Sequence, residues 1–234
     1  MGGIRVSDRG VYEGGGARPS DVVFEVMNQH YHGGQRAFQD RFDTRRLADR
    51  LAESTTDVIV ERHKAFIERR DMFFIATASE DGWPEASYKG GAPGFVRVLD
   101  ERTLAFPVYN GNGMFLSAGN VSVNSRVGML FIDWATGTRL RLSGEASIDP
   151  EDPLIATYPG AQLVVRVRTR AVFANCRRYV HRMQLIEPSP FVPSGTEDPP
   201  VPDWKRDPWF EGTLPAGDPA LDADHPSAPS NPEF

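Results

Sequence analysis

Cysteine is almost absent from this chain of 234 residues. Its one cysteine, Cys176, can neither form an internal disulfide nor build a zinc site alone. Such scarcity is typical of proteins in the reducing cytoplasm, so we expect a cytoplasmic location. The N-terminal sequence has no charged start followed by an apolar run, and no secretory signal is expected.

Long hydrophobic runs and basic stretches are also lacking. No window approaches the roughly 18 apolar residues of a membrane span, so no membrane partner is expected. The 26 basic and 32 acidic residues give a net charge of −6. Because no basic stretch alternates with aromatic residues, nucleic acid is not expected as a partner either. Local clusters such as Arg166, Arg168 and Arg170 better suit a small anion or a partner surface.

The common catalytic motifs are missing as well. There is no G-x-G-x-x-G after a strand, no P-loop, no H-E-x-x-H and no G-x-S-x-G. His30 and His32 lack the cysteine or carboxylate cluster that would complete a metal site, so no metal is predicted. Cys176 and His181 could suggest a nucleophile and a base, but their spacing says little about geometry. The sequence therefore assigns no catalytic residue.

Composition divides the chain into three parts. Residues 1–43 are predicted to form a mobile glycine-rich arm with a short helix, and residues 44–187 a domain with a helical lead-in. Residues 188–234 form a tail that holds twelve of the 19 prolines and few apolar residues. We expect Trp204 and the pair Trp209-Phe210 to anchor this tail on a neighbouring subunit. The residues after them are predicted to be disordered.

Short runs of apolar and β-branched residues separated by tight turns fill the middle of the chain. Asp81-Gly82 is a typical hairpin turn. Strands are predicted at 72–78, 83–88, 95–99, 103–108, 127–132, 139–148 and 163–173. Helices are predicted after Ser20-Asp21, at 45–52, from about 54 to 69 and within 114–123. Gly33-Gly34 is interpreted as a break before residues 35–41. Six or seven short strands joined in this way favour a closed antiparallel barrel over a parallel α/β sheet.

The stretch Asn110 to Ser125 lies between two of these strands and contains two glycine turns and a short helix. Glycine lets the backbone approach a ligand closely, and asparagine can both donate and accept hydrogen bonds. Free N–H groups at a helix start suit an anion. This stretch therefore predicts a site for a phosphorylated cofactor.

Further polar side chains lie on neighbouring strands. Ser87, Tyr88 and Lys89 end one strand, and Arg139 and Arg141 alternate on another. Each has a plain structural explanation when taken alone: the lysine as a solvated strand end, and the arginines as the outer face of a sheet. The asparagines of the central stretch, Asn120 and Asn124 included, are common in turns and caps. Taken together, these residues follow a family pattern.

Residues 72–148 resemble the FMN-binding split β-barrel of the pyridoxamine 5′-phosphate oxidase-like superfamily. The resemblance is carried by four runs: F-I-A-T-A-S-E-D-G-W-P-E-A-S-Y-K-G-G, F-V-R-V-L-D-E-R-T-L-A-F-P, N-G-N-G-M-F-L-S-A-G-N-V-S-V-N-S-R-V-G-M-L-F-I-D and T-R-L-R-L-S-G-E-A-S-I. The later run V-F-A-N-C-R-R-Y is similar to the end of the barrel in flavin-binding relatives.

The resemblance implies a mainly β, antiparallel Greek-key split barrel with flanking N-terminal helices. It also implies a homodimer that binds FMN between its subunits. Ser87 and Lys89 match the strand that contacts the flavin and its phosphate, and Arg139 matches a residue that reaches the flavin from the other subunit. The cofactor-binding residues it implies are Ser87, Tyr88, Lys89, Tyr109, Asn110, Asn112, Met114, Asn120, Arg139 and Arg141.

The sequence departs from the true oxidases at two points. The basic run that follows the phosphate turn in those enzymes is replaced by Asn112-Gly113-Met114. The phosphate would then depend on Lys89, backbone N–H groups and an arginine such as Arg97 or Arg141. The substrate-binding Arg-x-His pattern is not evident either. The resemblance thus points to a flavin-nucleotide-binding protein other than the true oxidase.

We therefore expect an FMN-dependent oxidoreductase that acts on a small organic substrate, with NAD(P)H or F420 as the candidate electron donors. Two alternatives remain open. One is a flavin or haem carrier without turnover. The other is an F420-dependent reductase on the same fold.

Overall fold

The computed structural model describes residues 31–195 and 198–228, so the helix predicted after Ser20 lies outside the described residues. The chain divides into two compact units between Thr55 and Thr56. The first unit contributes two helices to the described part. The second contains the strands, the remaining helices and the proline-rich segment. None of the described helices is long and apolar enough to cross a bilayer.

The first unit consists of α2 (Gly33–Arg41) and α3 (Arg45–Ala52). Helix α2 begins at Gly33 because His32 caps it: the His32 side chain accepts from the Gln35 N–H, and the Gln35 side chain accepts from the His32 N–H. The Gly33-Gly34 pair, read in the sequence as a break, thus forms the first turn of a helix. Arg36 and Asp49 join the two helices by an ion pair of 2.6 Å.

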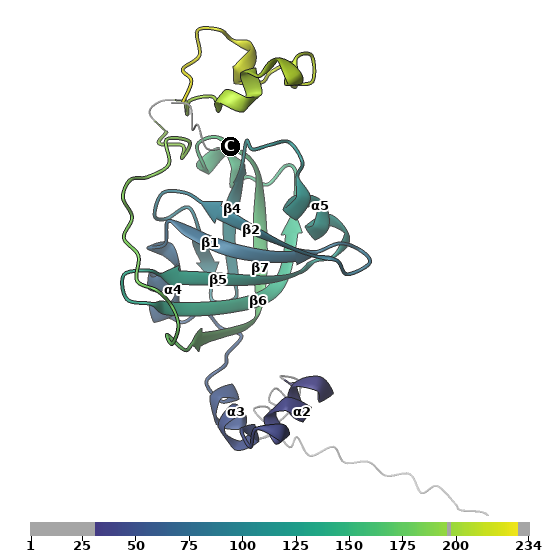
Figure 1. Cartoon of the computed structure of the whole chain (residues 1–234), viewed down its shortest axis with the longest axis vertical. Coiled ribbons are helices and arrows are strands. Elements are labelled where there is room, and N and C mark those ends of the chain that lie inside the picture. The colour runs from purple at the N-terminus through teal and green to yellow at the C-terminus, as the bar shows by residue number, and fades with distance from the viewer. Residues whose placement is uncertain (1–30, 196–197, 229–234) are drawn as a thin grey trace, which may run out of the picture. The chain divides into compact units, whose positions relative to one another are not determined.

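Seven antiparallel strands form one sheet in the second unit (Figure 1). Along the sheet they follow the order β2-β1-β5-β6-β7-β4-β3. Their bounds are β1 (Met72–Ala78), β2 (Pro84–Gly90), β3 (Arg97–Asp100), β4 (Thr103–Tyr109), β5 (Arg126–Asp133), β6 (Thr138–Ile148) and β7 (Ala161–Asn175). This arrangement confirms the predicted antiparallel split barrel, and each predicted strand lies within a few residues of an observed one.

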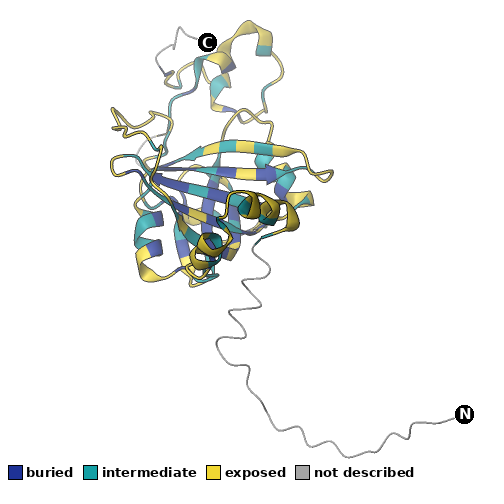
Figure 2. Cartoon of the chain, turned by 60° about the horizontal axis from the view of Figure 1, so that its bottom comes forward, coloured by how far each residue is buried: buried dark blue, intermediate teal, exposed yellow. Residues whose placement is uncertain are grey.

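The barrel core is built from the inward-facing residues of these strands. The rings of Phe73 and Phe106 lie 4.9 Å apart, and those of Phe73 and Phe131 lie 5.2 Å apart. All three side chains are buried. Figure 2 shows buried and exposed residues alternating along the strands, as a sheet with one covered face requires. Burying a side chain of this size contributes about 1.5–3 kcal/mol.

Helix α4 (Glu61–Glu68) packs against β3 and buries Ile67. It is shorter than the predicted helix, which began near residue 54. The reason is that the backbone before it bonds to the sheet instead: Thr56 exchanges hydrogen bonds with Val172, and the Ile59 N–H donates to the Glu101 carbonyl. Tertiary pairing has here overridden local helix propensity.

The proline-rich segment is folded from Val201 to Ala228, where the composition predicted disorder beyond Phe210. It forms 3₁₀ turns at η2 (Asp203–Arg206), η3 (Pro208–Phe210) and η4 (Pro219–Leu221), and Val201 pairs with Ser227 in a parallel bridge. Polar contacts replace a large apolar core. Lys205 Nζ forms a buried ion pair of 2.6 Å with Asp218.

Candidate functional site

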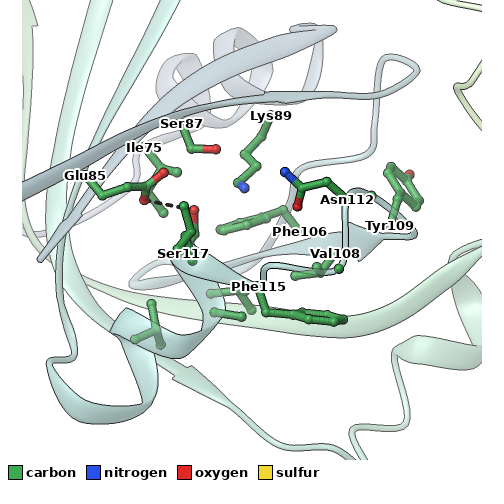
Figure 3. A pocket seen from close by; sticks show the side chains of 16 residues that line it. Ile75, Glu85, Ser87, Lys89, Phe106, Val108, Tyr109, Asn112, Phe115 and Ser117 are labelled. Carbon is green, nitrogen blue, oxygen red and sulfur yellow. Dashed lines mark hydrogen bonds between the residues drawn. The ribbon is translucent and has the colours of Figure 1, made fainter. Parts of the chain in front are cut away.

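A cavity of about 240 Å³ lies between β2 and β4, which are not neighbours in the sheet. Three side chains of β2 line it: Glu85, Ser87 and Lys89. They share one face because successive residues of a strand point to opposite sides. Figure 3 shows all three directed into the cavity. The rest of the wall is formed by Ile75, Phe106, Val108, Tyr109, Gly111, Asn112, Gly113, Phe115, Leu116, Ser117, Ala118, Val121 and Val165.

Lys89 is the one cationic side chain among the described residues that line this cavity. It is half-buried, and burial lowers the pKa of its ammonium group, although the charge of Glu85 opposes this shift. Within the described residues it forms neither a hydrogen bond nor an ion pair. Burying a charge without a partner is costly. The site therefore favours an anion beside Lys89.

The turn before helix α5 (Leu116–Val123) supplies backbone donors at the same cavity. The Asn112 side chain accepts from the Met114 N–H at 3.1 Å and holds this turn. Phe115, the residue before the helix, has φ of 48°, a left-handed conformation that costs a non-glycine residue about 1–3 kcal/mol. The backbones of Gly111 and Gly113 in this turn also line the cavity, so their N–H groups can bind an anion together with Lys89.

A hydrogen-bonded group of side chains lies on the Glu85 side of the cavity. Glu85 Oε2 accepts from Thr77 Oγ1 at 2.8 Å and from Ser117 Oγ at 3.1 Å; the second bond is drawn in Figure 3. Thr77 is buried, and its hydroxyl accepts in turn from Asn120 Nδ2 at 3.0 Å. Strands β1 and β2 and helix α5 are thereby joined at this wall.

The structure brings four of the predicted cofactor residues together at the cavity wall: Ser87, Lys89, Tyr109 and Asn112. Burial raises the pKa of the Tyr109 phenol, against the opposing charge of Arg97, so the hydroxyl stays protonated and can donate. Asn110 precedes the turn, and its side chain accepts from Lys205 Nζ at 3.2 Å. Met114 follows the turn and is largely exposed.

The remaining predicted residues do not line the cavity. Tyr88 points to the other face of β2 and packs edge-on against Phe74. The Asn120 side chain does not reach the cavity and donates instead to the Thr77 hydroxyl. The Arg139 guanidinium donates to the Cys176 carbonyl, and Arg141 is exposed on β6.

Arg97, which was expected as a second phosphate ligand, is engaged elsewhere. Its guanidinium lies 3.7 Å from the centre of the Tyr158 ring. It also donates to the Thr157 hydroxyl at 2.6 Å and to the Thr157 carbonyl at 2.9 Å. Of the basic residues that the sequence offered as phosphate ligands, only Lys89 thus lines the cavity.

Sequence reasoning missed two polar residues of the cavity wall, Glu85 and Ser117. The signal for Glu85 was present, because it lies two residues before Ser87 and four before Lys89 on one strand. Ser117 gave no such signal. Its position depends on where α5 begins, and that start is set by the left-handed Phe115.

A family model described as pyridoxamine 5′-phosphate oxidase matches residues 59–185. This match spans more than half of the chain, and the chain belongs to the pyridoxamine 5′-phosphate oxidase family. No curated protein sequence matches it significantly.

Several solved structures are similar to this chain. HupZ of Group A Streptococcus is 18% identical, with 54% of this chain and 99% of that chain covered and a TM-score of 0.42. HutZ, the haem storage protein of Vibrio cholerae, is 19% identical, with 48% and 91% covered and a TM-score of 0.38. An FMN-binding protein from Syntrophomonas wolfei is 8% identical, with 59% and 97% covered and a TM-score of 0.38.

Proposed function

We propose that this protein binds FMN in the cavity beside Lys89 and is an FMN-dependent oxidoreductase acting on a small organic substrate. The observation that carries the proposal is the half-buried Lys89 ammonium, which points into the cavity without an ion-pair partner among the described residues. Membership of the pyridoxamine 5′-phosphate oxidase family supports a phosphorylated ring compound as the ligand.

The residues of the cavity fit the two parts of FMN. Lys89, Asn112 and backbone N–H groups of the turn at Gly111 and Gly113 would hold the phosphate, since they combine a charge with backbone donors. The apolar side chains of Ile75, Phe106 and Val108 would cover the ring. When bound, the flavin supplies the hydride or electron chemistry, and the protein supplies position and electrostatics.

A second copy of the chain would complete the site. At about 240 Å³ the cavity is smaller than the ~300–1,000 Å³ typical of ligand pockets. Three apolar residues beside it are also exposed: Met114 by 61%, Phe115 by 46% and Leu116 by 52%. Clustered apolar exposure of this kind is typical of an interaction surface. We therefore propose a homodimer that covers the ligand from this side.

Haem as the ligand is less well supported by the same cavity. Protein haems are usually held by an axial histidine, cysteine, methionine or tyrosine. Of the described residues lining the cavity, none is a histidine or a cysteine, and Tyr109 alone belongs to this group. F420 carries its phosphate group on the ribityl chain of a flavin-like ring, so the Lys89 argument applies to it as well.

Titration with FMN, F420 and haemin, followed by fluorescence and absorbance, tests the choice of ligand. Tight binding of FMN supports the proposal, whereas exclusive binding of haemin or F420 would replace it. Anaerobic mixing of the FMN-loaded protein with NADH, NADPH or reduced F420 then tests turnover. An oxidoreductase should lose its flavin absorbance faster than free FMN does, and a carrier should not.

A further inference from the structure

The cavity carries opposite charges on one strand. Glu85 and Lys89 lie four positions apart on β2, which places their Cα atoms about 13 Å apart on the same face. Figure 3 shows the Glu85 carboxylate near Ser117 and the Lys89 ammonium near Asn112. A ligand whose anionic group lies at Lys89 therefore extends toward a carboxylate.

The Glu85 carboxylate is fixed in place and has one free oxygen. Both of its hydrogen bonds, from Thr77 Oγ1 and Ser117 Oγ, end on Oε2. Its Oε1 accepts no hydrogen bond from the described residues. Thr77 is 3% exposed and is itself held by Asn120. An ionised carboxylate can only accept, so Oε1 is available to a donor on the ligand.

We infer that Glu85 determines which ring compounds the cavity takes, by accepting a hydrogen bond from a ring N–H at the end opposite the phosphate. This inference rests on the proposed binding of FMN. The oxidised flavin ring has a single N–H, at N3 of its pyrimidine edge, and a deazaflavin has the same group. Haem offers no such peripheral donor, and its propionates would be repelled by the Glu85 charge.

The negative charge of Glu85 has a second consequence for the bound ring. A fixed carboxylate beside the pyrimidine edge opposes the negative charge that this edge gains on reduction. Glu85 should therefore lower the reduction potential of the bound flavin, and Glu85→Gln should raise it. A purely structural role for Glu85 predicts no such directed shift.

The test compares FMN with N3-methyl-FMN, which keeps the phosphate but lacks the N–H. Wild type and Glu85→Gln are titrated with both, and Glu80→Gln is the control because Glu80 is exposed in the turn before β2. The ratio of the two dissociation constants is the readout, since any repulsion between Glu85 and the phosphate cancels in it. A hydrogen bond to a charged acceptor is stronger than one to a neutral acceptor. The preference for FMN over N3-methyl-FMN should therefore fall about five- to tenfold in Glu85→Gln.

The results distinguish a failure of the role of Glu85 from a failure of FMN binding. Wild type that prefers FMN, with the preference reduced in Glu85→Gln and retained in Glu80→Gln, supports the role of Glu85. Wild type that binds both flavins equally would overturn that role and leave FMN binding intact, and this comparison needs no variant to fold. Wild type that binds neither flavin would overturn both claims.

Discussion

Replacing Lys89 by methionine should weaken FMN binding without destabilising the cofactor-free protein. Methionine keeps most of the length of the side chain and removes its charge. A charge-assisted hydrogen bond contributes about 1.5–3 kcal/mol, so the dissociation constant for FMN should rise about 10- to 150-fold. Riboflavin lacks the phosphate, and its affinity should change far less.

The cofactor-free protein gives the second half of this prediction. Burial lowers the pKa of Lys89 in the folded state, so its charged form opposes folding. This cost to folding is present below the folded-state pKa of Lys89. It disappears as the pH rises toward the unfolded-state pKa of 10.5. Lys89→Met should therefore melt no lower than wild type at neutral pH.

Isothermal titration with FMN and riboflavin, together with thermal melts, measures both effects. Lys64→Met is the matched control, because Lys64 lies on α4 and does not line the cavity. An unchanged FMN affinity in Lys89→Met would mean that the lysine does not contact the phosphate. A large fall in melting temperature without FMN would refute the view that its charge is uncompensated.

Three further predictions concern stability and assembly. The Arg166 guanidinium lowers the pKa of Asp152, so wild type should lose stability to urea as the pH falls through that lowered pKa, and Asp152→Asn should lose less. Lys205→Met leaves Asp218 buried without its cation and should destabilise the folded segment from Val201 to Ala228 by about 3–5 kcal/mol; limited proteolysis should cut it faster there, and adding Asp218→Leu should restore resistance. Phe115→Glu puts a charge on the exposed apolar surface and should shift light-scattering mass from dimer to monomer; an unchanged mass would argue against this surface as the interface.

Much of the barrel could be predicted because its turns are encoded locally. Asp81-Gly82 fixes the hairpin of β1 and β2, and the observed strands follow it directly. Elements that depend on distant partners were missed. The stretch from Thr56 to Ile59 looks helical by itself, but its backbone bonds to Val172 and Glu101, far away in the sequence.

The proline-rich segment shows the same limit of local reasoning. Its composition predicts disorder because it offers few apolar residues to bury. The fold from Val201 to Ala228 depends instead on specific polar contacts, among them Lys205 with Asp218 and the Arg206 guanidinium with the carbonyls of Asp222 and His225. Composition carries no information about such pairs.

At the candidate site, alternation along a strand was the informative pattern. It explains why Ser87 and Lys89 face the cavity while Tyr88 does not. The orientations of Arg97 and Arg139 could not be read in this way, because each is fixed by a distant residue, Thr157 or Cys176. The family pattern pointed to strands that line the cavity and could not say which side chains of this chain face it.

Gel filtration tests directly whether the cavity beside Lys89 holds FMN between two copies of the chain. The purified protein should be mixed with micromolar FMN and passed through a gel-filtration column with absorbance and light-scattering detection. We expect a dimer peak that carries one FMN per subunit, with a flavin band near ~450 nm. A colourless protein peak, with all FMN in the low-molecular-weight fraction, would contradict it.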